Sequence, residues 1–158
     1  MSLTINTTIN GTPVSASAEP STSLLEFLRD TLEYKGTKLC CNTGECGACT
    51  IIFNGKPINS CVTMAADAIG AQITTIEGLA DGDKLHPVQQ AFIDTGAVQC
   101  GYCTPGYIIS VKVLLDRTKK PTAEDIEEAV SGNICRCTGY TKIVDAIQLA
   151  ADRMAGRS

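Results

Sequence analysis

The sequence predicts an α+β protein in two parts: a small mixed sheet with one helix, then an antiparallel bundle of four helices. Three observations support this prediction. Residues 1–78 hold short alternating segments and two Asn-Gly turns, which are strong local signals for β-hairpins. Residues 79–158 hold four segments with helix-start signals and apolar residues at helical spacing. Nine cysteines divide between the parts, five in the first and four in the second.

In the first part, strands are predicted on both sides of each Asn-Gly turn, and one more strand follows them. The predicted strands are residues 3–9, 13–17, 50–53, 56–60 and 72–76. Between the hairpins, Ser23 begins a Ser-Leu-Leu-Glu sequence that is typical of a capping box. The apolar residues from Leu24 to Leu32 follow at helical spacing, so we expect one helix across the sheet.

The second part carries four helix signals. Proline lies in the first turn of the first two helices, Thr122 caps the third, and Gly132 is expected to end it. The predicted helices are residues 87–95, 104–119, 122–132 and 140–154. The short connections between them favour an antiparallel bundle. Residues 78–84 resemble a linker, so we predict one domain over residues 1–78 and another over residues 79–158.

Composition narrows the function. The chain has 158 residues, 13 Lys and Arg, and 17 Asp and Glu, a net charge of −4 that argues against a nucleic-acid surface. The longest apolar stretch, residues 107–115, is too short to span a membrane, and no signal peptide is evident. A cytoplasmic location is therefore predicted, where cysteine-rich patterns indicate metal binding or catalysis more often than disulfides. With one histidine and no Ser–His–Asp set, no catalytic residue is assigned.

The cysteines form two sets of four, with one left over. The first set is Cys41-x4-Cys46-x2-Cys49 followed by Cys61, and its triplet has the plant-type [2Fe–2S] spacing. The glycines between these ligands, Gly44 and Gly47, suit a backbone with unusual dihedral angles.

The second set pairs Cys100-x2-Cys103 with Cys135-x-Cys137, and each pair precedes a predicted helix. Helix N-termini carry a partial positive charge that favours thiolates. Structural zinc also uses four cysteines with C-x2-C pairs. The spacing favours iron–sulfur over zinc for the first set, but it leaves both open for the second. A thioredoxin-like redox pair fits poorly at Cys46 and Cys49, because a strand rather than a helix follows them.

Four motifs together resemble the iron–sulfur subunit of the xanthine oxidase family of molybdenum hydroxylases. They are GTKLCCNTGECGACT (residues 36–50), NSC (59–61), QCGYCTPG (99–106) and GNICRCTGY (132–140). The resemblance covers about residues 3–153. It implies an N-terminal plant-type ferredoxin-like (β-grasp) domain and an all-α four-helix-bundle domain, each with one [2Fe–2S] cluster.

The resemblance also implies the site residues. Cys41, Cys46, Cys49 and Cys61 match the ligands of the cluster nearer the flavin. Cys100, Cys103, Cys135 and Cys137 match the ligands of the cluster nearer molybdenum. Gln99 matches a glutamine that hydrogen-bonds molybdopterin, and the sulfur matching Cys137 lies next to the pterin.

An electron-transfer subunit is the function that the resemblance implies. The catalytic centre would lie on a large molybdopterin-binding subunit, with FAD on a medium subunit, in a hetero-oligomer such as a heterotrimer. Alternatives are the small subunit of a carbon monoxide dehydrogenase or a hydroxybenzoyl-CoA reductase, a free-standing ferredoxin-like carrier, and a zinc-stabilised interaction module. Gln99 and the helical domain argue against the free carrier.

Two residues need separate interpretation. Cys40 stands where the family usually has glycine; a positive φ there would strain the cysteine, and we interpret its side chain as a small apolar filler. His86 precedes Pro87 and is expected to cap or pack at the start of a helix rather than to bind a metal.

Overall fold

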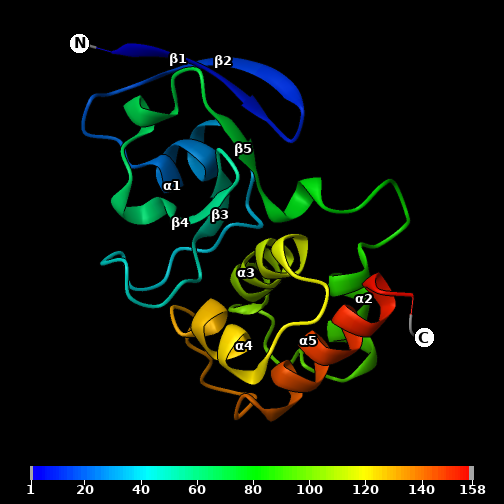
Figure 1. Ribbon diagram of the computed structural model, residues 1–158. Helices are drawn as coiled ribbons and strands as arrows, with labels where there is room; N and C mark the ends of the chain where they lie inside the picture. Colours follow the sequence, from blue (N-terminus) through cyan, green and yellow to red (C-terminus); the bar gives the residue numbers. More distant parts are fainter. Residues whose placement is uncertain (1, 157–158) are drawn as a thin grey trace.

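The first part of the chain is a mixed sheet of five strands (Figure 1). The structure is a computed structural model that describes residues 2–156. The strands are β1 (Leu3–Ile9), β2 (Thr12–Ala18), β3 (Thr50–Phe53), β4 (Lys56–Asn59) and β5 (Gln72–Thr74). They lie in the order β2-β1-β5-β3-β4, with β1 and β5 parallel and the other pairs antiparallel. The predicted hairpins and the α+β class are confirmed.

Strand β5 is two residues shorter than predicted. The backbone N–H of Thr75 donates to the side-chain oxygen of Asn10 at 2.9 Å, and the Asn10 amide donates to the Thr75 hydroxyl at 3.0 Å. These bonds replace the sheet bonds at Thr75, and a 3₁₀ turn, Ile76–Gly78, follows at once. A side chain in the first hairpin therefore ends the last strand.

The helix under the sheet begins as predicted but continues differently. Ser23 and Glu26 form the expected capping box, and α1 (Leu24–Glu26) then widens into a π-helical turn, Phe27–Thr31. The N–H of Leu32 reaches the carbonyl of Phe27 at 3.1 Å, five residues back. The predicted single α-helix is thus wrong beyond its first turn.

The first turn of this helix is buried on two sides. Leu24, Phe27 and Leu28 pack into the core of the sheet, whereas Leu25 packs against Cys49 and Cys61. The helix therefore joins the sheet core to two of the cysteines.

Up to residue 156, where the described part of the chain ends, the second part has four α-helices, as predicted: α2 (Pro87–Asp94), α3 (Thr104–Arg117), α4 (Ala123–Val130) and α5 (Thr141–Met154). In Figure 1, α2 and α5 lie together on one side and α3 and α4 lie on the other. Each helix contributes fully or nearly fully buried side chains to one apolar core. Among them are Phe92, Tyr107, Leu114, Ile126 and Ile147.

Gly132 does not end α4. The helix stops at Val130, and Gly132 does not take the left-handed conformation of a glycine cap. The turn is closed instead by Asn133, whose N–H donates to the Val130 carbonyl at 2.9 Å.

Helix α3 contacts both parts of the chain. Ile109 and Val113 pack against Ile52 of β3, while other α3 side chains lie in the helical core. The sheet and the bundle therefore share an interface.

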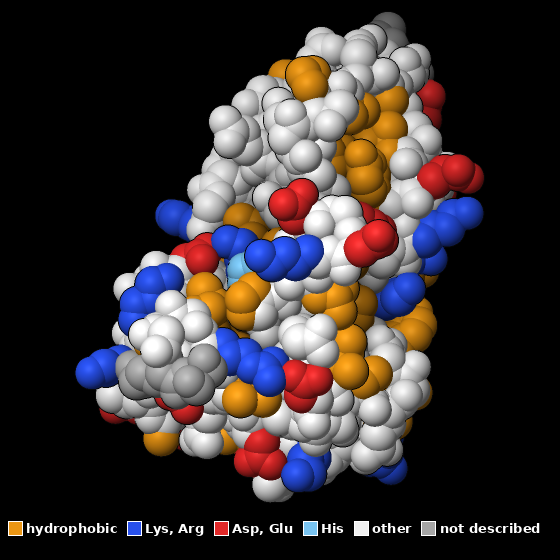
Figure 2. Space-filling view, turned by 90° about the vertical axis from the view of Figure 1, so that its right-hand side faces the viewer, with side chains coloured by type: hydrophobic (Ala, Val, Ile, Leu, Met, Phe, Trp, Pro, Cys, Tyr) orange, Lys and Arg blue, Asp and Glu red, His pale blue; other side chains and the backbone are white. Residues whose placement is uncertain are grey.

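Charged residues of both signs lie interspersed on the face shown in Figure 2. None of the described helices is both long enough and apolar enough to cross a membrane.

His86 caps helix α2, as expected. Its Nδ1 accepts the N–H of Val88 at 3.3 Å, and the N–H of His86 donates to the side-chain oxygen of Gln89 at 2.9 Å. Burial, followed by the charge of Lys112, holds the pKa of His86 below its ordinary value. Protonation would remove the acceptor and place a cation at the positive end of a helix.

We expect this cap to weaken as the pH falls. The unfolded chain takes up the proton at about pH 6.5, before the folded chain does. The stability that neutral His86 contributes is therefore complete above about pH 6.5 and is lost as the pH falls through the lower folded-state pKa. Thermal unfolding midpoints between about pH 7.5 and 5.5 should fall more in the wild type than in His86→Ser, whose serine also caps helices. Equal pH dependence in both proteins would contradict this account.

Candidate cluster-binding site

Three cysteines of the first set lie on the loop between the π-helical turn and β3, and the fourth lies after β4. Cys49 directly precedes β3, and Cys61 lies in the 3₁₀ turn Ser60–Val62 that follows β4. The antiparallel pairing of β3 with β4 brings them together, and the Ser60 hydroxyl donates to the Cys49 carbonyl at 2.8 Å. Cys49 and Cys61 are buried, whereas Cys41 and Cys46 are partly exposed.

Glycines shape this loop as predicted. Gly44 has a φ of 81° and Gly47 a φ of 67°, a conformation that disfavours side chains. Two polar side chains hold the glycine carbonyls: Asn59 donates to Gly44 at 2.6 Å, and the Thr50 hydroxyl donates to Gly47 at 2.7 Å. Residues of the hairpin thus support the shape of the cysteine loop.

The thiols of the first set differ in acidity. Hydrogen bonds from the side chain and the backbone of Thr43 lower the pKa of Cys41 to about 5. Burial, and then the neighbouring Cys49, raises the pKa of Cys61 to about 12. Because a metal ligand must be a thiolate, the surroundings of Cys41 favour its ligating form, whereas those of Cys61 favour the thiol until a cation binds.

The second set lies at the starts of two helices. Cys103 is the residue before α3, and Cys135 and Cys137 lie in the turn before α5. The sulfurs of Cys100 and Cys137 are 3.5 Å apart. As the sequence predicts, both pairs are placed where helix N-termini favour negative charge.

Cys135 has the most hydrogen bonds of the second set. Its sulfur accepts from the Thr138 hydroxyl at 3.1 Å and from the N–H groups of Thr138 and Cys137 at 3.4 Å each. Burial alone would raise the pKa of Cys135, but these bonds outweigh it and the pKa is lowered. Burial also raises the pKa of Cys103 to about 12, with a further contribution from Cys135.

The eight cysteines lie as four neighbouring pairs. Side-chain proximity joins Cys41 to Cys46, Cys49 to Cys61, Cys103 to Cys135, and Cys100 to Cys137, and the leftover Cys40 also lies beside Cys46. Within the described residues, no three His, Cys, Asp or Glu side chains surround a single metal-ion position. Paired sulfurs suit a [2Fe–2S] cluster, in which two cysteines bind each of two irons. The donor set therefore fits two such clusters.

The leftover Cys40 is exposed, so our interpretation of its side chain as an apolar filler is wrong. Its backbone does not have a positive φ, and the cysteine replaces the family's usual glycine without strain. The neighbouring Cys46 raises the pKa of the Cys40 thiol.

The predicted pterin contacts are at the surface. Gln99 and Cys137, the two residues predicted to contact the pterin, are exposed, and so is Cys100, whereas Cys135 is buried and Cys103 partly buried. The second set thus has one edge turned outward and one turned into the helical core.

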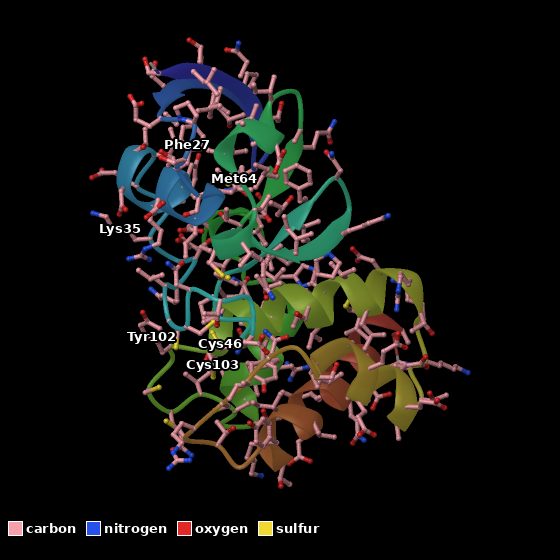
Figure 3. All side chains as sticks on the ribbon, turned by 90° about the vertical axis from the view of Figure 1, so that its left-hand side faces the viewer. Phe27, Lys35, Cys46, Met64, Tyr102 and Cys103 are labelled. Carbon is pink, nitrogen blue, oxygen red and sulfur yellow. The ribbon has the colours of Figure 1, made fainter. Side chains whose placement is uncertain are left out.

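The two sets lie on adjoining loops. In Figure 3, Cys46 and Cys103 lie at the junction of the two parts, with Tyr102 beside them. The N–H of Ile134 donates to the carbonyl of Cys46 at 3.0 Å. The Tyr102 hydroxyl also donates to the carbonyl of Leu39 across the same junction.

Two supporting residues escape the sequence reasoning. Tyr140 has a φ of 68°, and its hydroxyl accepts the N–H of Cys135 at 3.2 Å. Asn133 is buried between the loops. The motif GNICRCTGY contains both residues, but their spacing predicts neither role.

Two family models match the chain. Residues 7–72 match the 2Fe-2S iron-sulfur cluster binding domain, and residues 75–148 match the [2Fe-2S] binding domain.

Similar proteins match nearly the whole chain. It is 48% identical to the nicotinate dehydrogenase small FeS subunit of Eubacterium barkeri, over 97% of this chain and 98% of that one. It is 47% identical to the xanthine dehydrogenase iron-sulfur-binding subunit of Escherichia coli O157:H7, over 92% of each. The crystal structure of quinoline 2-oxidoreductase from Pseudomonas putida 86 superposes with a TM-score of 0.94 at 40% identity, over 98% of this chain and 97% of that chain.

The fold, the two paired cysteine sets and these matches agree. The chain belongs to the iron–sulfur subunits of the xanthine oxidase family of molybdenum hydroxylases.

Proposed function

We propose that this chain carries electrons between a molybdopterin centre and FAD or an external acceptor, using two [2Fe–2S] clusters. Cys41, Cys46, Cys49 and Cys61 would hold one cluster, and Cys100, Cys103, Cys135 and Cys137 the other. The observation that carries this proposal is the hydrogen bond of 3.0 Å from Ile134 to the Cys46 carbonyl, because it connects the two ligand loops directly.

A bound [2Fe–2S] cluster supplies reversible one-electron oxidation and reduction. The residues of this chain hold it and set its environment. Thr43 and Thr138 donate hydrogen bonds to the sulfurs of Cys41 and Cys135, which stabilises their negative charge. Burial of Cys49, Cys61 and Cys135 keeps water from part of each site.

The backbone offers a short connection between the two sets. It runs from Cys46 through its carbonyl to the N–H of Ile134 and on to the next residue, Cys135. Both ends of this connection belong to the proposed ligands, so no other side chain is needed between them.

The exposed edge of the second set supports an orientation toward a large molybdopterin-binding subunit. Gln99, Cys100 and Cys137 are accessible there, which suits contact with a pterin held by another chain. The first set would then face a medium FAD-binding subunit in a hetero-oligomer, and substrate oxidation would take place on the large subunit.

The domain division and location are also proposed. A boundary near residue 78 is supported by the separate cores of the sheet and the helices. A cytoplasmic location is supported by the two cysteine sets proposed to hold clusters, since thiols stay reduced there and cysteine-rich patterns are then typical of metal sites.

The other functions have less support. The relatives described above are named as parts of a nicotinate dehydrogenase, a xanthine dehydrogenase and a quinoline 2-oxidoreductase. None of these names favours a carbon monoxide dehydrogenase or a hydroxybenzoyl-CoA reductase. A free-standing carrier does not account for the exposed Gln99 beside the second set, and a zinc module does not account for paired sulfurs.

Purification of the native protein tests this function. We expect co-purification of a molybdopterin-containing large chain and an FAD-containing chain, with about four irons per copy of this chain. Iron, acid-labile sulfide and zinc assays, together with the visible spectrum, measure the cluster content. Zinc in place of iron, or a preparation without a molybdopterin-containing partner, would contradict the proposal.

A further inference from the structure

Asn133 lies buried where the two cysteine-bearing parts meet, with 6% of its surface exposed. Its polar groups are all hydrogen-bonded. Within the helical part, its N–H donates to Val130, its side-chain oxygen accepts from the Ser110 hydroxyl at 2.8 Å, and its carbonyl accepts from the Tyr107 hydroxyl. These bonds fix the orientation of Asn133 within the helical part.

The remaining donor of Asn133 crosses the junction. Its side-chain nitrogen donates to the carbonyl of Gly47 at 3.0 Å, between residues 86 positions apart. Gly47 directly follows Cys46, and Cys135 lies two residues after Asn133. This bond and the Ile134–Cys46 bond therefore join one ligand loop to the other at adjacent positions.

Two glycines allow this approach. A Cβ on Gly106 of α3 would lie 2.1 Å from the Gly47 carbonyl oxygen, and a Cβ on Gly47 would lie 2.3 Å from the Gly132 carbonyl oxygen. Both contacts are with backbone, which cannot rotate aside as a flexible side chain can. The separation of the two loops is therefore set by backbone packing as well as by hydrogen bonds.

Asn59 makes a comparable bond but does not cross the junction. It donates to the Gly44 carbonyl at 2.6 Å within the sheet part, so it shapes one loop only. Asn59 thus supports the shape of a single cysteine loop, whereas Asn133 holds two loops against each other.

We propose that Asn133 is a positioning residue for electron transfer. Held by Ser110 and Tyr107, it fixes the loop of Cys46 and Cys49 against the loop of Cys135 at one separation, through the carbonyl of Gly47. The inference rests on the proposed function, because it assumes that both sets hold clusters. Its consequence is a constant distance between the two redox centres, on which the electron-transfer rate depends steeply.

Gly106→Ala tests this arrangement at its most sensitive point. Alanine is intrinsically favoured over glycine within a helix, so a disturbance in Gly106→Ala would arise from its Cβ, which would lie 2.1 Å from the Gly47 carbonyl oxygen and 3.1 Å from the Asn133 side-chain nitrogen. Gly132→Ala is the matched control, because its Cβ would meet no atom within 4 Å and its φ is not positive. Asn133→Ser is the second variant, since serine is too short to keep the bond to Gly47.

The readout is low-temperature EPR of the dithionite-reduced full chain with its clusters, in which two nearby paramagnetic clusters split each other's signals. We expect splitting in the wild type and in Gly132→Ala. We expect narrowed splitting in Gly106→Ala and Asn133→Ser, with about four irons per chain retained. The rate at which electrons redistribute between the two clusters, measured by stopped flow, should fall in the same two variants.

The outcomes separate the two levels of inference. Fewer than two cluster signals in the wild type would contradict the proposed function itself. With both clusters present, wild-type splitting in Gly106→Ala or in Asn133→Ser would overturn the positioning role. So would absence of splitting from the wild type. If one of these two variants loses a cluster, the EPR splitting of the other variant tests the positioning role. If both lose a cluster while Gly132→Ala keeps both, the contact is structural only and the positioning role is rejected.

Discussion

Replacing Cys135 with alanine is expected to remove about half of the iron, leaving about two irons of about four per chain. Cys135 is buried, and its sulfur accepts three hydrogen bonds. Without it, the iron that it would share with Cys103 has a single cysteine, and a cluster held by three ligands is exposed to loss. The first set is on another loop and should keep its cluster.

The measurements are iron and sulfide per chain, visible absorption, and EPR of the reduced protein. One of two EPR signals should vanish, and the absorption should fall by about half because one of two clusters is lost. Cys40→Ser is the matched control, because its thiol is exposed and its neighbour Cys41 is the proposed ligand. Full iron in Cys135→Ala would refute the assignment of the second set. Loss of half the iron in Cys40→Ser would show that the first set uses Cys40 in place of Cys41.

Replacing Phe92 with alanine is expected to lower the free energy of unfolding by about 3–5 kcal/mol. Phe92 is 1% exposed in the core shared by the four helices. Cys103 packs against this same core, and Phe92 lines a surface pocket together with Gly101, Thr104 and Pro105 of the turn that follows Cys100. The truncation should therefore weaken the second cluster site as well as the fold.

The neighbouring Ile93 provides the control, because it is 57% exposed on the same helix. Ile93→Ala should change the free energy of unfolding by about 0.5 kcal/mol or less. Denaturant titration followed by circular dichroism gives both values, and bleaching of the visible absorption reports cluster loss during the same titration. Equal destabilisation by the two substitutions would contradict the described core.

Local signals predicted most of the fold. Asn-Gly turns and capping residues act within a few positions of the chain, so the hairpins at Asn10 and Asn54 and the starts of all the helices are predictable from neighbours alone. Two of the misjudged ends have distant or unusual causes. The last strand stops because Asn10, 65 residues away, takes the N–H of Thr75. The first helix widens into a π-helical turn where two different surfaces, the sheet core and the cysteine turn, cover its sides.

The sequence by itself predicted the two cysteine sets and their separation into a strand-rich and a helical part, because residue spacing in a tight loop is a local property. Its four motifs together carried the resemblance to the family. Only the tertiary structure decided how the sulfurs pair, that Cys40 is exposed rather than packed, and that Asn133 spans the junction to Gly47. Such contacts join residues up to 86 positions apart. They arise when the sheet and the helices pack against each other, and no local periodicity records that packing.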